Sequence, residues 1–215
     1  MPKRGWFAYL EGEDPEYPVK ALQADFKEVR RKVEMIRNDI TSPDTRLAYY
    51  LLELNPAETD TLVNLMLGGY FAGGRIWTLH SRFRYFDPEK RRSGMPEDVG
   101  ALVEKLGADS ATLTLVNVNP VEPRTVIVQA GGYGEHTFES VTLDGQTSAM
   151  GGPHLRVRLE PGSGARLVFR MARYKNQPTL GYPWDRIPIR VDVAVKKSAK
   201  RLCVRPIGLR RPLLR

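Results

Sequence analysis

The stretch VIVQAGGYGEHTFESVTLDG, residues 126–145, decides how the second half of the chain is interpreted. A run of β-branched residues ends at Gly131 and Gly132, and a second alternating run begins at Phe138. Phosphate-binding glycine loops lie between a strand and a helix N-terminus, where aligned N–H groups face the anion. The residues after Gly134 have the twofold period of a strand instead. We therefore interpret these glycines as a corner that joins two strands.

The twofold period continues on both sides of this corner. We expect strands near residues 112–117, 125–129, 138–143, 154–159 and 166–171. The segments NPVEP, GGYG, DGQTS and EPGSG between them consist of turn-forming residues. Short strands at a spacing of roughly ten residues favour an antiparallel sandwich. The segment IPIRVDVAV also alternates, and Pro188 on its other face would confine that strand to a sheet edge.

The first half of the chain has helical periodicity. From Val19 to Ile36 the apolar residues recur in steps of three and four, which predicts an amphipathic helix. Two further segments begin with helix-start signals, SPDTRLAYYLLELNP and AETDTLVNLMLGG. Asn55 and Pro56 precede the second segment, and Glu58 is placed to complete a capping box. The second segment ends on two glycines, which is typical of a helix C-terminus. A half-buried strand is expected in RIWTLHSRFRYFDP, and a further short helix from Pro96 to Gly107.

These patterns predict an α+β fold. A helical N-terminal layer would pack on a C-terminal antiparallel β-sandwich, and a basic arm would end the chain. The expected boundaries are an N-terminal arm (1–18), a helical region with one strand (19–107), the β-sandwich (108–185), and a basic edge strand and tail (186–215).

The net charge of +8 comes from the C-terminal segment. Residues 186–215 contain ten Lys and Arg and one acidic residue, Asp192, so the remaining 23 basic and 24 acidic residues leave residues 1–185 with a charge of −1. Nucleic acid is therefore a candidate partner only through the tail. The candidate polyanion-binding residues are Lys196, Lys197, Lys200, Arg201 and Arg205. The tail contains no aromatic residue for base stacking.

Other features exclude several classes of protein. Cys203 is the only cysteine, which excludes an internal disulfide framework and a cysteine zinc cluster. The histidines have no metal-binding spacing and the glycines no nucleotide-binding context, so neither a metal nor a cofactor is expected. No apolar run reaches the roughly 18 residues of a membrane span. The first residues lack the apolar stretch of a secretory signal, and on that ground we expect a cytoplasmic location, except in the case that the chain is a fragment of an exported protein.

Three residues are candidates for acid–base chemistry. A Glu beside a His can orient and tune the imidazole, which makes Glu135 and His136 candidates together with Asp87. Neighbouring residues on a strand point to opposite faces, however. On that geometry Glu135 and His136 would not share a site, and a strand corner with polar side chains is the favoured interpretation.

Aromatic residues near strand ends are candidates for ligand binding. Flat aromatic faces flanked by polar side chains are suited to sugars and other small molecules. The candidates are Tyr133, Tyr174, Tyr182 and Trp184. The last three lie in RYKNQPTLGYPWDR, a segment that prolines interrupt.

One part of the sequence resembles a known architecture. The segments TLVNVNPVEPRTVIVQAGGYGEHTFESVTLDG and LRVRLEPGSGARLVFRMARY, with a strand ending at Val116-Asn117 and a turn from Leu159 to Leu167, are similar to the small β-sandwich at the C-terminal end of large bacterial proteins of carbohydrate-active type. An all-helical toroid precedes that sandwich. The resemblance covers residues 40–180 and implies that the helices between 19 and 67 correspond to the last helices of the toroid. It carries over no catalytic residue, because the toroid's cleft lies on helices that this chain is too short to contain.

These observations favour a non-catalytic accessory or assembly module. It would bind a glycan or a partner protein through the sandwich edge and its loops. One alternative is a fragment that completes the active site of a carbohydrate-active enzyme. Another is a nucleic-acid-associated protein that acts through its basic tail. The sequence indicates no oligomeric state.

Overall fold

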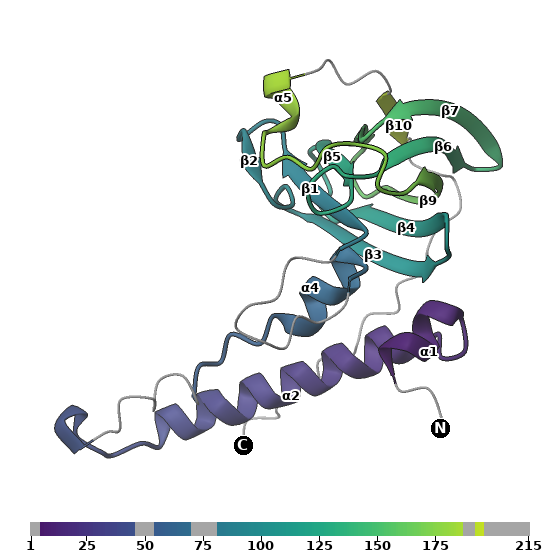
Figure 1. Ribbon diagram of the computed structural model, residues 1–215. Helices are drawn as coiled ribbons and strands as arrows, with labels where there is room; N and C mark the ends of the chain where they lie inside the picture. Colours follow the sequence, from purple (N-terminus) through teal and green to yellow (C-terminus); the bar gives the residue numbers. More distant parts are fainter. Residues whose placement is uncertain (1–4, 46–53, 70–80, 187–191, 196–215) are drawn as a thin grey trace.

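The computed structural model describes residues 5–45, 54–69, 81–186 and 192–195. Within these ranges the chain combines helices with ten strands in two sheets, so the fold is α+β (Figure 1). The helices are α1 (Trp6–Glu11), α2 (Tyr17–Arg37), α4 (Asp60–Leu67) and α5 (Pro183–Arg186), with a 3₁₀ turn, η1 (Pro43–Thr45).

Each sheet has five strands. The first has the order β10 (Asp192–Val195), β8 (His154–Leu159), β5 (Arg124–Ala130), β1 (Phe83–Asp87) and β2 (Arg92–Ser93). The second has the order β3 (Val99–Leu106), β4 (Ser110–Asn117), β9 (Gly164–Ala172), β6 (Thr137–Leu143) and β7 (Gln146–Gly152). The five strands predicted between residues 112 and 171 are confirmed. β10 lies at a sheet edge, as predicted, but it pairs with β8 in parallel, whereas the other pairs are antiparallel.

The two sheets share one hydrophobic core. Alternate residues of β8 and β9 are buried, as expected for strands with one inward face, whereas β5 is buried on both faces from Val126 to Ala130. Phe83 of the first sheet packs against Phe169 of the second with ring centroids 5.3 Å apart, and Phe169 stacks on Phe138 at 4.5 Å. These aromatic contacts join the sheets face to face.

The helix predicted from Pro96 to Gly107 is wrong, because residues 99–106 form β3. β3 pairs with β4 and contains a β-bulge between Val103 and Lys105. A bulge adds one residue to a strand. Val103 and Leu106 both pack on the core, so the step between them is three instead of two, which imitates a helical spacing. The region assigned as helical with one strand therefore also contains β2 and β3.

β7 is absent from the sequence prediction. Most of its residues are exposed, because it is the edge strand of its sheet. Its sequence therefore lacks the apolar alternation that marks a half-buried strand. Asp144 and Gly145 form the two-residue turn between β6 and β7, and both have positive φ angles. DGQTS was predicted to be a turn between the strands at 138–143 and 154–159, but an Asp-Gly pair of this kind also signals a hairpin to a strand that follows at once, and that strand was missed.

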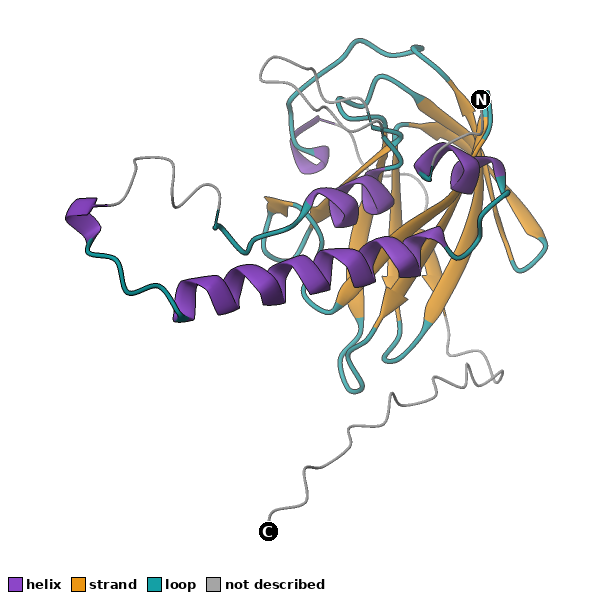
Figure 2. Ribbon diagram, turned by 90° about the horizontal axis from the view of Figure 1, so that it is seen from below, coloured by secondary structure: helices purple, strands orange, loops and turns teal. Residues whose placement is uncertain are grey.

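The helices α1 and α4 lie against β3. Residues 1–18, predicted to be an arm, contain α1, and its residues Tyr9 and Leu10 belong to the core. Tyr85 of β1 ties α4 to the first sheet, since its hydroxyl donates to the carbonyl of Met66 at 2.5 Å. α2, predicted from its apolar stripe, is a long helix that contacts α4 and extends past the sheets (Figures 1 and 2). Its Val19 and Phe26 are exposed.

Two details of the helix starts differ from the prediction. α4 begins at Asp60, after Thr59, and Glu58 pairs with Lys32 of α2 instead of completing a capping box. Of the helix expected after Ser42, only η1 lies within the described residues. The predicted strand residues 75–80 and the basic tail after Val195 lie outside them. No helix among the described residues is long and apolar enough to cross a membrane.

Candidate functional site

The corner between β5 and β6 is a turn that leads from strand to strand, as the sequence indicates. Gly131 and Gly134 have φ angles of +84° and +69°, which glycine adopts without strain. A side chain on Gly131 would collide with the carboxyl group of Glu135. The glycines therefore let the chain reverse and let Glu135 fold back over it. The next element is the strand β6 and not a helix, so the corner lacks the geometry of a phosphate-binding loop.

The corner is buried, which is unusual for a loop, and side chains satisfy its backbone. Loops usually lie on the surface because buried backbone groups need hydrogen-bond partners. Gln129 donates from Nε2 to the carbonyls of Gly131 and Gly132. Asn176 donates to the carbonyls of Gly134 (3.0 Å) and His136 (2.7 Å). These two amides hold the corner in one conformation.

Glu135 and His136 line the same pocket, contrary to the expectation from strand geometry. The opposite-face rule applies to strands, and β6 begins only at Thr137. The pocket has a volume of about 270 Å³, and we call it the helix–loop pocket because α1, the corner and the β3–β4 turn surround it. Its lining residues are Phe7, Leu10, Glu11, Gly68, Ser81, Arg82, Leu106, Gly107, Glu135, His136, Arg173 and Tyr174.

The ring nitrogens of His136 have defined roles. Nδ1 accepts a hydrogen bond from the backbone N–H of Tyr174 at 3.1 Å, so Nδ1 carries no proton and Nε2 carries it in the neutral ring. Burial lowers the pKa of His136 below its usual range, with smaller contributions from Glu135, which raises it, and from Arg82 and Arg173, which lower it. The ring is therefore neutral at pH 7 and presents an N–H donor at Nε2.

The donor at Nε2 is not hydrogen-bonded to the carboxylate beside it. Nε2 of His136 lies 3.8 Å from Oε1 of Glu135, whereas N–H···O bonds span about 2.7–3.2 Å. The other carboxylate oxygen of Glu135 accepts the backbone N–H of Tyr133 at 2.8 Å. The pocket thus contains a donor and an acceptor that face each other without bonding.

A second polar group in the pocket is also unsatisfied. Ser81 is only 6% exposed, and its Oγ has no hydrogen-bond partner within the described residues. Buried hydroxyls are nearly always hydrogen-bonded, and the exceptions call for an explanation. Arg82 and Arg173 add cationic groups, and Tyr174 packs edge-on against the His136 ring at 4.8 Å.

Asp87 does not belong to this pocket. Its side chain is buried and caps the turn after β1, where Oδ1 accepts the backbone N–H groups of Glu89 and Lys90 at 3.1 Å each. Arg92 approaches the other carboxylate oxygen at 3.4 Å. These contacts account for the carboxylate as a turn-stabilising group, away from Glu135 and His136.

The four aromatic candidates fall into separate places. Tyr174 lines the helix–loop pocket, and Tyr133 lies in the corner. Tyr182 and Trp184 stack on each other at 5.0 Å, and both contact Phe86 edge-on on the outer side of the first sheet. Tyr182 and Trp184 therefore cover Phe86, which is 1% exposed.

Several residues of the pocket carry no sequence signal. Ser81 and Arg82 are neighbours in the chain, Arg173 lies far from them, and the three match no motif. The strand alternation in RIWTLHSRFRYFDP does place Ser81 on the same side as Phe83 and Tyr85, and a lone polar residue on that side was the available hint. The candidate polyanion-binding residues Lys196, Lys197, Lys200, Arg201 and Arg205 lie outside the described residues.

Comparison with known proteins gives one match. Residues 2–63 match the model of a domain of unknown function, DUF8034. This segment contains α1 and α2 and ends within α4, and it covers less than a third of the chain. No curated protein and no solved structure matches the chain.

Proposed function

We propose that this chain is a non-catalytic binding module in which a helical layer packs on a β-sandwich. In this proposal the helix–loop pocket takes a hydroxyl-bearing ligand, a small saccharide. It thus acts as an accessory module that binds a glycan. The site lies between the sandwich and the helix α1.

The observation that carries the proposal is the 3.8 Å separation of His136 Nε2 and Glu135 Oε1. The two atoms are too far apart to bond each other, but one oxygen atom can lie within hydrogen-bond distance of both. A hydroxyl group accepts from the Nε2–H and donates to the carboxylate, which neither a purely donating nor a purely accepting group can do. The unsatisfied Oγ of Ser81 offers a further donor and acceptor in the same pocket.

The charges of the pocket support a neutral ligand. Arg82 and Arg173 balance Glu11 and Glu135, and His136 is neutral, so the lining has no formal net charge. A volume of about 270 Å³ lies just below the range of roughly 300–1,000 Å³ that is typical of drug-sized ligand sites. One or two sugar rings are the size of ligand that such a pocket accommodates.

The roles of His136 and Glu135 support binding rather than catalysis. A general base needs a free nitrogen, but Nδ1 accepts a backbone N–H and Nε2 is already protonated. Glu135 accepts the N–H of Tyr133, which fixes its orientation. Both side chains are thus suited to holding a ligand in one pose.

A second candidate function is the completion of a carbohydrate-active enzyme's active site. The observation that favours it is the presence of two carboxylates, Glu11 and Glu135, in one pocket. Glycoside hydrolysis commonly uses such a pair. Hydrolysis or elimination of a glycan by the full chain, lost in Glu135→Gln, would establish this function in place of the first.

The test of the binding function is a titration of the full chain with methyl pyranosides and their deoxy analogues, followed by NMR. We expect binding to at least one pyranoside, and loss of that binding when one particular hydroxyl is removed. Ser81→Ala should weaken binding about fivefold to tenfold. Ser163→Ala is the matched control, because Ser163 is also buried but its Oγ donates to the carbonyl of Glu160 at 2.7 Å.

Two results would refute the binding function. One is the absence of binding across the panel. The other is binding that Ser81→Ala leaves unchanged together with unchanged chemical shifts of His136. Long-range ¹H–¹⁵N spectra of the imidazole check the premise, since they distinguish a ring protonated at Nε2 from one protonated at Nδ1.

A further inference from the structure

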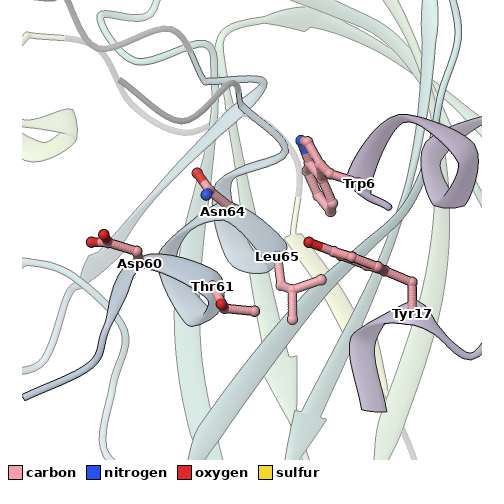
Figure 3. Close-up of a pocket in the computed structure, with 6 residues that line it drawn as sticks. All are labelled: Trp6, Tyr17, Asp60, Thr61, Asn64 and Leu65. Atoms are coloured by element: carbon pink, nitrogen blue, oxygen red, sulfur yellow. The ribbon is translucent and has the colours of Figure 1, made fainter. Parts of the chain in front are cut away.

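A second cleft lies between α1, α2 and α4 and shares no lining residue with the helix–loop pocket. It has a volume of about 210 Å³ and is lined by Trp6, Tyr17, Asp60, Thr61, Asn64 and Leu65 (Figure 3). Four of these six residues fall within the segment that matches the domain of unknown function. We call it the Trp6 cleft.

The aromatic walls of the Trp6 cleft are fixed in place. The indole Nε1 of Trp6 donates to the carbonyl of Gly69 at 2.9 Å, which sets the orientation of the ring. Tyr17 stacks on Tyr9 at 6.0 Å and is tilted by 43° to Trp6. Gly5 lies so close to Tyr17 that an added Cβ would be 2.9 Å from the ring. Because other residues hold both rings, ligand binding would not have to order them.

The opposite side of the cleft is polar and uncommitted. Thr61 and Asn64 of α4 present a hydroxyl and an amide, and Tyr17 adds a phenol hydroxyl. Among the residues that the structure describes, none of these three groups makes a hydrogen bond. Buried Leu65 forms an apolar part of the lining. The cleft therefore combines two fixed ring faces with three polar groups that both donate and accept.

Two ligand classes use aromatic walls, and the position of Asp60 decides between them. An alkylammonium ion needs ring faces around the charge and is helped by a nearby carboxylate. In the view of Figure 3 the carboxylate of Asp60 lies on the far side of α4 from both rings, so it does not complete such a cage, and the amide of Asn64 turns outward at the rim of the cleft. A sugar ring instead needs an apolar face for the aromatic wall and hydroxyl partners at the rim, which Thr61, Asn64 and Tyr17 supply.

We propose that the Trp6 cleft binds a single pyranose ring, with one face against the aromatic wall and its hydroxyls directed to α4. The volume is below that of drug-sized sites, which favours one ring over an oligosaccharide. This site is independent of the helix–loop pocket. Its existence does not depend on the function proposed for that pocket.

The experiment is an NMR titration of the full chain with methyl pyranosides, in which the indole N–H signals of the three tryptophans are followed. Trp6→Phe assigns the Trp6 signal. We expect one pyranoside to shift the Trp6 indole signal in a saturable way, with millimolar affinity. Asn64→Leu, which replaces the amide by an apolar side chain of similar size, should weaken this binding at least tenfold.

Controls separate the two sites. Ser81→Ala should leave the Trp6 shift unchanged, and Asn64→Leu should leave binding in the helix–loop pocket unchanged. Leu62→Asn, at an exposed position of the same helix, is a matched control that should not alter the titration. Thermal unfolding of each variant shows whether α4 is intact.

Three results would overturn the proposal. The first is the absence of any Trp6 shift across the panel at tens of millimolar. The second is a shift that survives in Asn64→Leu with unchanged affinity. The third is saturable binding of choline or tetramethylammonium in preference to every pyranoside, which would identify an ammonium site instead.

Discussion

Two histidines near the β5–β6 corner differ in how their ring nitrogens are satisfied. Nε2 of His154 pairs with Oε1 of Gln129 at 3.0 Å, whereas Nε2 of His136 has its nearest carboxylate oxygen at 3.8 Å. Burial is the largest cause of a lowered pKa in both. The two rings therefore differ in how Nε2 is hydrogen-bonded.

The orientation of Gln129 completes the His154 network. Its Nε2 donates to the carbonyls of Gly131 and Gly132, so its Oε1 faces His154 and accepts the ring N–H. Each polar atom of the Gln129 amide is used. A satisfied buried network stabilises one structure, and an unsatisfied one marks a place where a ligand can bind. This difference separates structural polar groups from candidate functional ones.

Removal of Gln129 tests whether the hydrogen bonds around His154 stabilise the fold. It should have the largest effect on the free energy of unfolding. Gln129→Ala leaves the carbonyl of Gly131 and the N–H of His154 without partners, whereas the carbonyl of Gly132 still accepts from Arg84. Each unsatisfied buried group costs roughly 1–3 kcal/mol, so we expect the free energy of unfolding to fall by about 4 kcal/mol. Urea denaturation measures the change. Ser148→Ala on the exposed strand β7 should change it by less than about 0.5 kcal/mol.

Acidification should break the same network. Burial lowers the pKa of His154 to about 4, against 6.5 for an unperturbed histidine. The unfolded chain therefore binds a proton more readily than the folded one, and stability falls as the pH drops from about 6.5 towards 4. The expected loss between pH 8 and pH 4 is about 3 kcal/mol. It should be visibly smaller in His154→Gln, and an equal loss in both proteins would contradict the assignment.

Much of the two sheets could be predicted from sequence, because inward positions alternate along strands such as β8 and β9. In β5 the inward residues Val126, Val128 and Ala130 belong to the core, and the turn residues between strands set the spacing. The prediction failed at β3, where the bulge after Val103 imitates a helical step, and at β7, where exposure removes the pattern. Both failures have local physical causes.

The candidate site was predictable only in part. Glu135 and His136 are candidates from the sequence because they are neighbours, but the alternation of side chains along a strand predicts that they point to opposite faces. Their common pocket depends on Asn176, which lies some forty residues away and ties down both sides of the corner. That contact has no signature in residue spacing, and the only sign of Ser81 is its place on the same side of a predicted strand as Phe83 and Tyr85.

Asn176→Ala should loosen the β5–β6 corner, which holds His136 and Glu135 in one pocket. The variant therefore tests whether the arrangement around His136 depends on a rigid corner. The side chain donates to two carbonyls and accepts from the hydroxyl of Thr137 at 3.1 Å. We expect a loss of about 2 kcal/mol in unfolding free energy and weaker saccharide binding. Lys175→Ala, next to it and exposed, should have neither effect. Hydrogen exchange of the amides of residues 133–136 reports the loosening directly.

The smallest expected effects are those of replacing two buried serines, Ser163 and Ser81. One replacement should lower stability, and the other should lower ligand affinity. Ser163 donates its hydroxyl to Glu160, so Ser163→Ala should lower the free energy of unfolding by about 1 kcal/mol. Ser81 has no partner within the described residues, so Ser81→Ala removes an unsatisfied hydroxyl and should leave stability unchanged or raise it slightly. A residue that serves only the fold would not lose ligand affinity while stability is maintained. Denaturation curves and pyranoside titrations of both variants therefore decide whether Ser81 belongs to a binding site, and equal destabilisation of the two proteins would show that it does not.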